Sequence, residues 1–163
     1  MAALSTVVVV ASNRAADGVY EDTSGPILVE GFAAHGFNVA GPVVVHDGDE
    51  VEQALRDAVD DGYDLVVTSG GTGLTSTDLT PEATNRVIDF EIPGIAEAVR
   101  AAGRAGTPHA ALSRGICGVA RRTLIVNVAG STGAAKDALA VLTPRLLEHA
   151  VAQLHDGDHE RND

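Results

Sequence analysis

The residue types best suited to chemistry lie in one loop of this sequence. Residues 68–84 read TSGGTGLTSTDLTPEAT, which combines glycines, hydroxyl side chains and an acid between an apolar run and a predicted helix start. The glycines permit positive φ angles and close backbone approach, so successive N–H groups can surround an anion. A glycine-rich turn without a ligand is the simpler alternative. The residues predicted to form an anion site here are Ser69, Gly70, Gly71, Thr72 and Gly73.

Two acids are expected near this loop. Asp78 lies in the loop itself, and Asp47 follows a second apolar run at residues 37–45. Each acid has a local alternative, because Asp78 could form a turn or cap the next helix and Asp47 could begin a turn. Carboxylates beside phosphates would instead indicate a Mg²⁺ ion between them, since bare like charges repel. That arrangement predicts phosphoryl or nucleotidyl transfer, in which positioning and electrostatics provide the catalysis.

Two further segments carry groups that bind anions. Gly130 and Ser131 lie between a predicted strand and the N-terminus of a predicted helix, where backbone N–H groups favour negative charge. Ser113 and Arg114 add a hydroxyl and a guanidinium, and the guanidinium is a natural bidentate partner of phosphate. A solvated surface arginine is the alternative for Arg114.

The elements that must position these residues alternate along the chain. LSTVVVVA at residues 4–11 is a β-branched run typical of a strand covered on both faces. Gly41–Pro42 indicates a bulge or an edge position in the second strand. The predicted strands are residues 4–11, 37–45, 64–68 and 123–129. Helices are predicted at 24–36 with Ser24 as cap, after Asp49 with a capping box to Glu52, from Thr80–Pro81, and at 95–103, 134–142 and 144–154.

This alternation predicts a three-layer α/β/α fold with a mostly parallel central sheet. Ligands of such folds bind at the carboxyl ends of the strands. The polar loops that include Ser12, Asp47, Asp78 and Ser131 each follow a predicted strand, so we expect them to form one site.

Composition restricts the class of protein. The chain has 163 residues, 45% of them hydrophobic, and a formal net charge of −12, which argues against a nucleic-acid-binding surface. No apolar run is long enough to span a membrane, and no signal peptide is recognised. The single Cys117 is expected to be buried and suits a reducing cytoplasm. We predict one domain over residues 1–154 and a disordered acidic tail over 155–163.

Four segments in order carry a family resemblance. They are DTSGP at 22–26, VHD at 45–47, SGGTG with the following D and TPEA at 69–83, and LSRGICGVARRTLIVNVAGS at 112–131. Together they resemble the molybdenum-cofactor biosynthesis proteins of the MogA/MoaB type, which also occur as domains in gephyrin. The resemblance extends over nearly the whole chain.

The resemblance implies an adenylyltransferase that transfers AMP from Mg-ATP to the terminal phosphate of molybdopterin and releases pyrophosphate. It implies Mg²⁺ as cofactor, ATP as co-substrate, a homotrimer, and the molybdate-insertion enzyme as a candidate partner. It assigns catalysis and the metal to Asp47 and Asp78. It assigns nucleotide and phosphate binding to Ser12, Ser69, Gly70, Gly71, Thr72 and Gly73, and pterin binding to Ser24, Ser113, Arg114, Gly130 and Ser131.

The sequence departs from the family pattern at two positions. Asn13 stands where many members have Asp, and Ala129 replaces the proline of the PGS motif. The family also contains MoaB-like paralogues with little or no activity, so a non-catalytic pterin-binding or scaffold protein is a second hypothesis. A third is a nucleotide-binding protein that acts on another phosphorylated small molecule.

Overall fold

A six-stranded sheet forms the centre of the molecule. The computed structural model describes residues 2–156, and its strands lie in the order β2-β1-β3-β6-β5-β4. Strands β2, β1, β3 and β6 are parallel, whereas β5 is antiparallel to β6 and β4 is antiparallel to β5. The strands are β1 (Ser5–Ala11), β2 (Asn38–Val45), β3 (Leu65–Ser69), β4 (Phe90–Glu91), β5 (Cys117–Ala120) and β6 (Thr123–Val128).

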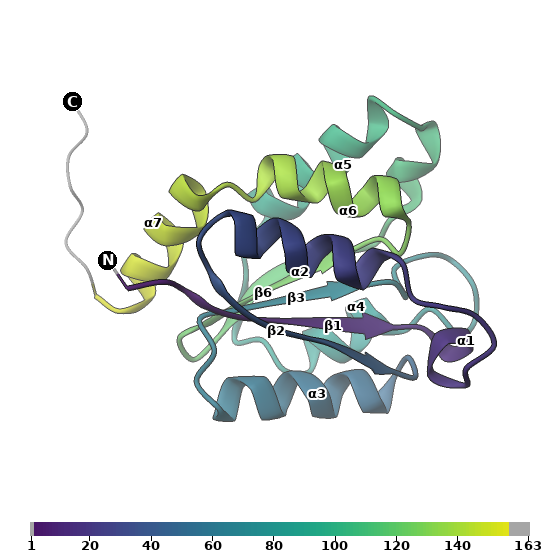
Figure 1. Cartoon of the computed structure of the whole chain (residues 1–163), viewed down its shortest axis with the longest axis horizontal. Helices are drawn as coiled ribbons and strands as arrows, with labels where there is room; N and C mark the ends of the chain where they lie inside the picture. The colour runs from purple at the N-terminus through teal and green to yellow at the C-terminus, as the bar shows by residue number, and fades with distance from the viewer. Residues whose placement is uncertain (1, 157–163) are drawn as a thin grey trace.

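Helices cover both faces of this sheet (Figure 1). One face is covered by α2, α5, α6 and α7, and the other by α3 and α4. The helices are α1 (Asn13–Ala16), α2 (Ser24–Ala34), α3 (Asp49–Asp60), α4 (Thr80–Asn85), α5 (Pro93–Arg104), α6 (Thr132–Val141) and α7 (Pro144–Leu154), with a 3-10 helix η1 (Pro108–Leu112). The predicted three-layer α/β/α fold is therefore confirmed.

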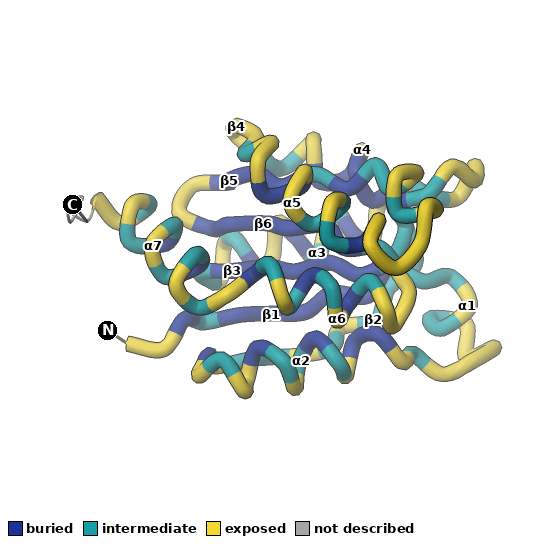
Figure 2. Tube along the Cα trace, turned by 90° about the horizontal axis from the view of Figure 1, so that it is seen from above, coloured by how far each residue is buried: buried dark blue, intermediate teal, exposed yellow. Residues whose placement is uncertain are grey.

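The alternation of side chains along β1 explains the two layers of core. Val8 and Val10 pack under α2 and α6, whereas Val7 and Val9 pack with α3 on the opposite face. Because successive side chains of a strand point to opposite faces, a strand buried on both sides must be apolar at every position. Figure 2 shows the central strands buried beneath helices whose outer surfaces are exposed.

The predicted strands and helices agree with the structure within a few residues, and the exceptions are short elements. β4, β5, α1 and the 3-10 helix η1 were not predicted. Gly41–Pro42 lies in the edge strand β2, where the register to β1 shifts between Val7 and Val9, so both the edge and the bulge predictions are confirmed. Cys117 is buried, as predicted, and burial raises the pKa of its thiol to about 12.

The predicted helix caps were wrong. Gly48, without a side chain, caps α3, while Glu52 bonds to arginine side chains and not back to the helix start. Ser24 is the first residue of α2, and its hydroxyl lies 2.8 Å from the hydroxyl of Ser69. Thr80 is the first residue of α4, where its hydroxyl donates to Asp47. In each case the side chain that was expected to cap its helix forms a hydrogen bond with a residue distant in sequence.

Two expectations concern the ends of the chain and membranes. The predicted tail lies largely outside the described residues, although His155 ends α7 and its Nε2 lies 3.3 Å from Oδ1 of Asp64. Within residues 2–156, no helix has the length and apolar character needed to cross a membrane.

Candidate active site

A cavity of about 770 Å³ opens at the carboxyl ends of β1, β3 and β6. Loops that follow these strands form one wall, and α5, η1 and the start of α6 form the other. The predicted site residues that line it are Ser12, Ser24, Ser69, Gly70, Gly71, Thr72, Gly73, Asp78, Ser113, Gly130 and Ser131. Asp47 and Arg114 do not line it. The sheet thus brings together loops that are far apart in sequence, as its topology predicts.

The glycine-rich loop presents a run of backbone N–H groups that, after Gly70, have no acceptor among the described residues. Gly70 has φ 95° and Gly71 has φ 68°, both in the region that favours glycine. The N–H of Gly70 donates to the carbonyl of Val128 over 2.9 Å. Within residues 2–156, the N–H groups of Gly71, Thr72, Gly73 and Leu74 have no hydrogen-bond acceptor. Successive free N–H groups after a left-handed turn form a site suited to an anion.

Glycine is required in this loop by packing as well as by conformation. A Cβ atom on Gly70 would lie 2.4 Å from the carbonyl oxygen of Ala11. Gly130, on the neighbouring loop, approaches so closely that its Cβ would lie 3.1 Å from Cα of Gly70. The close approach of three backbone segments therefore explains the glycines at both positions.

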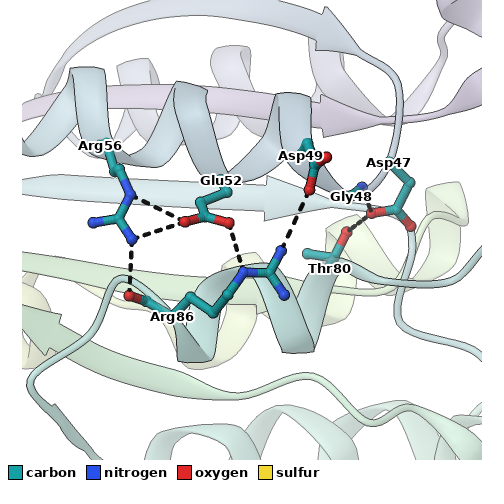
Figure 3. Close-up of polar contacts among 7 residues, drawn as sticks. All are labelled: Asp47, Gly48, Asp49, Glu52, Arg56, Thr80 and Arg86. Carbon is teal, nitrogen blue, oxygen red and sulfur yellow. Dashed lines mark hydrogen bonds and ion pairs between the residues drawn. The ribbon is translucent and has the colours of Figure 1, made fainter.

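Asp47, in the loop after β2, bonds to the start of α4 (Figure 3). Its Oδ1 accepts from the hydroxyl of Thr80 and from the N–H of Gly48, both over 2.8 Å. Its Oδ2 accepts from the N–H of Leu79 over 2.9 Å. A Cβ on Gly71 would lie 2.1 Å from Oδ2 of Asp47, so this carboxylate lies directly against the loop. Its predicted local role, the start of a turn, is also present in the bond to Gly48.

Asp78 lies against the other end of the same loop. Its Oδ2 accepts from the N–H and the hydroxyl of Thr75, over 2.9 and 2.7 Å. A Cβ on Gly73 would lie 2.8 Å from that oxygen. Within residues 2–156 its Oδ1 has no hydrogen-bond partner, and Asp78 lines the cavity. Asp78 therefore forms a turn, as its simpler alternative required, while its other oxygen remains available.

An ion-pair network between α3 and α4 supports this arrangement (Figure 3). Glu52 accepts from Arg56 on its own helix over 2.8 Å and from Arg86, just after α4, over 2.5 Å. The two guanidinium groups, Arg86 first, lower the pKa of Glu52. Because α4 begins at Thr80, the network holds the helix whose first hydroxyl bonds to Asp47.

Hydroxyl groups connect the loops around the cavity. The hydroxyls of Ser24 and Ser69 lie 2.8 Å apart, and Ser113 donates to the hydroxyl of Thr72 over 3.2 Å. Ser131 caps α6 by accepting from the N–H of Ala134 over 3.0 Å. These serines therefore already have protein partners: Ser24, Ser69 and Ser113 connect neighbouring loops, whereas Ser131 caps its own helix.

Arg114 binds the glycine-rich loop from outside the cavity. Its Nε donates to the carbonyl of Gly73 and its Nη2 to that of Asp78, each over 2.9 Å. Its Nη1 donates to Glu82, an ion pair that lowers the pKa of the Glu82 carboxyl and raises that of Arg114. Every arm of this guanidinium has a protein partner, whereas the sequence suggested a phosphate ligand.

Several cavity residues were not anticipated from sequence. They include Arg100 and His109 on the α5–η1 wall, Asn127 on β6, and Asp22, whose Oδ2 is buried without a hydrogen-bond partner in the described chain. Arg100 lies four residues after the buried Ala96, on the same face of α5. That spacing could have indicated an arginine at the edge of the buried face.

The side chains at this loop suit a magnesium ion that substrate phosphates help to bind. Among residues 2–156, no cluster of three or more His, Cys, Asp or Glu side chains could hold a metal by itself. Mg²⁺ is commonly bound by one or two carboxylates together with substrate phosphates and water, so a complete protein cage is not needed. The free Oδ1 of Asp78 beside unpaired loop N–H groups fits that mode. Asp47, whose two oxygens both have donors, would contribute less directly.

A family model described as a probable molybdopterin binding domain matches residues 7–149. The chain belongs to this family. A solved MogA structure is 50% identical, with a TM-score of 0.88 over 91% of this chain and 98% of that one. A solved MoaB structure from Thermus thermophilus is 38% identical, with a TM-score of 0.86 over 94% of this chain and 97% of that one.

Curated relatives of this molybdopterin-binding family member differ in length. A protein of Helicobacter pylori named molybdopterin adenylyltransferase is 36% identical over 83% of this chain and 80% of its own length. The Drosophila melanogaster protein named molybdenum cofactor synthesis protein cinnamon is 38% identical over 83% of this chain, which spans only 23% of it. The family resemblance predicted from sequence motifs is thus confirmed.

Proposed function

We propose that this protein acts in molybdenum cofactor biosynthesis as a molybdopterin adenylyltransferase. In this reaction an oxygen of the terminal phosphate of molybdopterin attacks the α-phosphorus of ATP. The bond from that phosphorus to the bridging oxygen breaks, so AMP is joined to the pterin phosphate and pyrophosphate leaves. Relatives that carry the name molybdopterin adenylyltransferase support the assignment.

One observation is central to this proposal: the glycine-rich loop combines unpaired N–H groups with a carboxylate at each end. Gly71 lies against Asp47 and Gly73 against Asp78, while the N–H groups of residues 71–73 have no acceptor within residues 2–156. A set of preorganised donors stabilises charge that develops on phosphoryl oxygens, and a nearby carboxylate attracts a metal ion to the same place. The loop is suited to positioning a phosphoanhydride, which is what nucleotidyl transfer requires.

The proposed residue roles follow from this placement. Ser12 and the loop from Ser69 to Gly73 would hold the nucleotide phosphates, and Ser24, Ser113, Gly130 and Ser131 would line the pterin side of the cavity. Asp78 would hold Mg²⁺ together with those phosphates, and Asp47 would fix the loop and the start of α4. Bound Mg²⁺ would neutralise phosphate charge and orient the two reacting groups.

The same proposal includes the setting of the reaction. We infer a homotrimer, a cytoplasmic location in which ATP is available, and the molybdate-insertion enzyme as the consumer of the adenylylated pterin. A non-catalytic pterin-binding paralogue is the second candidate. The bonds that occupy both oxygens of Asp47 favour it, because such a carboxylate is already committed to structure.

The test is a direct assay of both products. Purified protein is mixed with molybdopterin, ATP and Mg²⁺, and adenylylated pterin and pyrophosphate are measured. Wild type should form both, Asp78→Asn should lose at least about 100-fold in rate because it lacks the charge that holds the metal, and exposed Asp61→Asn should match wild type. Molybdopterin binding without product would support the non-catalytic paralogue, and absence of both would overturn the pterin assignment.

A further inference from the structure

The cavity of this acidic protein contains very little positive charge. Among the residues that line it within the described chain, the acids are Asp22, Asp78 and Asp137, whereas the basic side chains are Arg100 and His109. Arg100 keeps its positive charge at every physiological pH, because a guanidinium does not lose its proton in proteins, so it is the permanent cation among these side chains. A site for phosphate-bearing ligands in a chain of net charge −12 needs such a cation.

Arg100 is held in place on only one side. Its Nη1 donates to the carbonyl of Gly115 over 2.6 Å and to that of Ser113 over 3.4 Å. Within residues 2–156, Nε and Nη2 of Arg100 have no acceptor, and the side chain makes no ion pair. This differs from Arg114, which donates to the protein through Nε and both terminal nitrogens.

The anchor of Arg100 also places it near the glycine-rich loop. Ser113, whose carbonyl Arg100 approaches, donates its hydroxyl to that of Thr72 in the loop over 3.2 Å. The guanidinium is thus fixed to the segment that joins the α5 wall of the cavity to the unpaired N–H groups. A fixed guanidinium with two free nitrogens is well suited to a phosphate group.

We infer that Arg100 is the phosphate-binding guanidinium of this cavity, and that Arg114 is a positioning residue that holds the loop between Gly73 and Asp78. This inference rests on the proposed function in that the phosphate belongs to one of its two substrates, either ATP or the pterin. Arg100 recognises the phosphate group that they share. The role predicted for Arg114 from sequence is thereby transferred from the segment before β5 to a residue of α5.

Calorimetric titration of the whole protein with ATP, with pyrophosphate, with molybdopterin and with adenosine tests this assignment. Arg100→Gln should weaken binding of at least one phosphate-bearing ligand about tenfold, consistent with loss of a charge-assisted hydrogen bond. Adenosine, which has no phosphate, should bind as to wild type. A loss confined to ATP and pyrophosphate would identify the nucleotide phosphate, and a loss confined to molybdopterin the pterin phosphate.

Arg104→Gln is the matched control, because it removes the same charge from the same helix one turn further on and Arg104 does not line the cavity. It should bind every ligand as wild type does. The inference is overturned if Arg100→Gln stays within twofold of wild type for all phosphate-bearing ligands, or if Arg104→Gln loses as much. Should Arg100→Gln fail to fold, Arg100→Lys decides by the same twofold criterion, since a single ammonium cannot bond Gly115 and also present two nitrogens.

The binding measurement separates this inference from the proposed function. Wild-type protein that binds phosphate ligands through Arg100 but forms no adenylylated pterin would disprove the transferase and leave the Arg100 assignment intact. If Arg100→Gln still formed product and bound every ligand with wild-type affinity, the Arg100 assignment would be disproved and the transferase would stand.

Discussion

Asp47 and Asp78 contact the same loop but differ in what their carboxylates hold together. The carboxylate of Asp47 accepts from Leu79 and Thr80, which lie more than thirty residues away in sequence, whereas within residues 2–156 the carboxylate of Asp78 accepts from Thr75 alone, three residues away. We expect Asp47→Ala to lower the free energy of unfolding by about 1–3 kcal/mol, because it leaves these donors without an acceptor. Asp78→Ala should cost less than about 1 kcal/mol, as is usual for a half-exposed side chain with local bonds.

Urea unfolding at pH 7 measures both free energies, and product formation is measured on the same samples. The expected pattern is loss of activity in both variants but loss of stability mainly in Asp47→Ala. If Asp78→Ala were the more destabilised of the two, the structural role assigned to Asp47 would be wrong.

At the residue scale, the sequence predicted which residues lie at the site better than it predicted their hydrogen-bond partners. The glycines, Asp78 and the serines were predicted from the composition of single loops, because positive φ and hydroxyl donors are local properties. Arg114 and Arg100 could not be distinguished in that way. Which guanidinium faces the cavity depends on the carbonyls of Gly73 and Gly115, and sequence does not reveal where those carbonyls point.

At the scale of elements, the contact between α3 and α4 depends on Glu52. We expect Glu52→Gln to lower Tm by about 1–3 °C at pH 7, because an ion pair on the surface contributes modestly even when two arginines share it. Since the pKa of Glu52 is lowered in the folded state, its contribution is present above the unfolded value near 4.5 and is lost as pH falls through the folded value.

Calorimetric melts of Glu52→Gln from pH 3 to 7 should therefore converge with wild type at the acidic end. Glu97→Gln, at an exposed position on α5, should follow wild type throughout. A difference in Tm that persists undiminished at pH 3 would contradict the ion-pair explanation.

His46 connects the end of α1 to α3, and its pKa is raised in the folded protein, whereas that of Glu52 is lowered. Its Nε2 lies 2.6 Å from Asp17, at the end of α1, and its Nδ1 lies 3.0 Å from Glu50 on α3. The hydrogen bond to Asp17, followed by that to Glu50, raises the pKa of His46. Its stabilising contribution is therefore complete below the unfolded value of about 6.5 and is lost as pH rises through the folded value.

We expect His46→Gln to melt about 1–2 °C below wild type near pH 5.5 and together with it at pH 8.5, because both side chains of the pair are about half exposed to solvent and such a pair contributes little. The pKa of Glu50 is lowered mainly by the backbone N–H of His46 and secondly by the His46 side chain, so Glu50 remains charged over this range. A larger difference at pH 8.5 than at pH 5.5 would reverse the predicted sign.

The prediction of elements succeeded where their pattern is local and continuous. β1 and β6 are apolar runs, and α3 shows helical spacing that ends at Gly62 with φ 78°. The capping box failed because Arg86, 34 residues away, takes the carboxylate of Glu52. β4 and β5 were missed because they are short and acquire their structure by pairing, with Glu91 opposite Gly118 in an antiparallel ladder.

At the scale of the whole molecule, alternating strands and helices predicted both the three layers and the end of the sheet that carries the cavity. This succeeded because parallel strands with helical connections place all their carboxyl ends together. The sequence could not show which buried hydrogen bonds connect the strands and loops that form the cavity. The buried side chain of Asn127 makes such bonds to segments from different parts of the chain.

Asn127 on β6 donates through Nδ2 to the hydroxyls of Thr68 on β3 and Thr84 on α4, each over 3.0 Å. Its Oδ1 accepts from the N–H of Ile116, which leads into β5, over 3.2 Å. Asn127→Ala would remove all of these bonds inside the fold and leave the N–H of Ile116 unpaired. We expect the free energy of unfolding to fall by about 2–4 kcal/mol, because a buried polar group that loses its partner retains its desolvation cost.

Because these bonds connect β6 to β3, to α4 and to the segment that leads into β5, their loss should weaken the domain as a unit. The urea midpoint of Asn127→Ala should decrease while the slope of the transition stays at the wild-type value, as for a cooperative domain with an unchanged unfolded state. Asn38→Ala, on the exposed edge strand, should remain within about 0.5 kcal/mol of wild type. A shallower slope or a second transition in Asn127→Ala would instead show that the site end of the sheet unfolds separately from the rest.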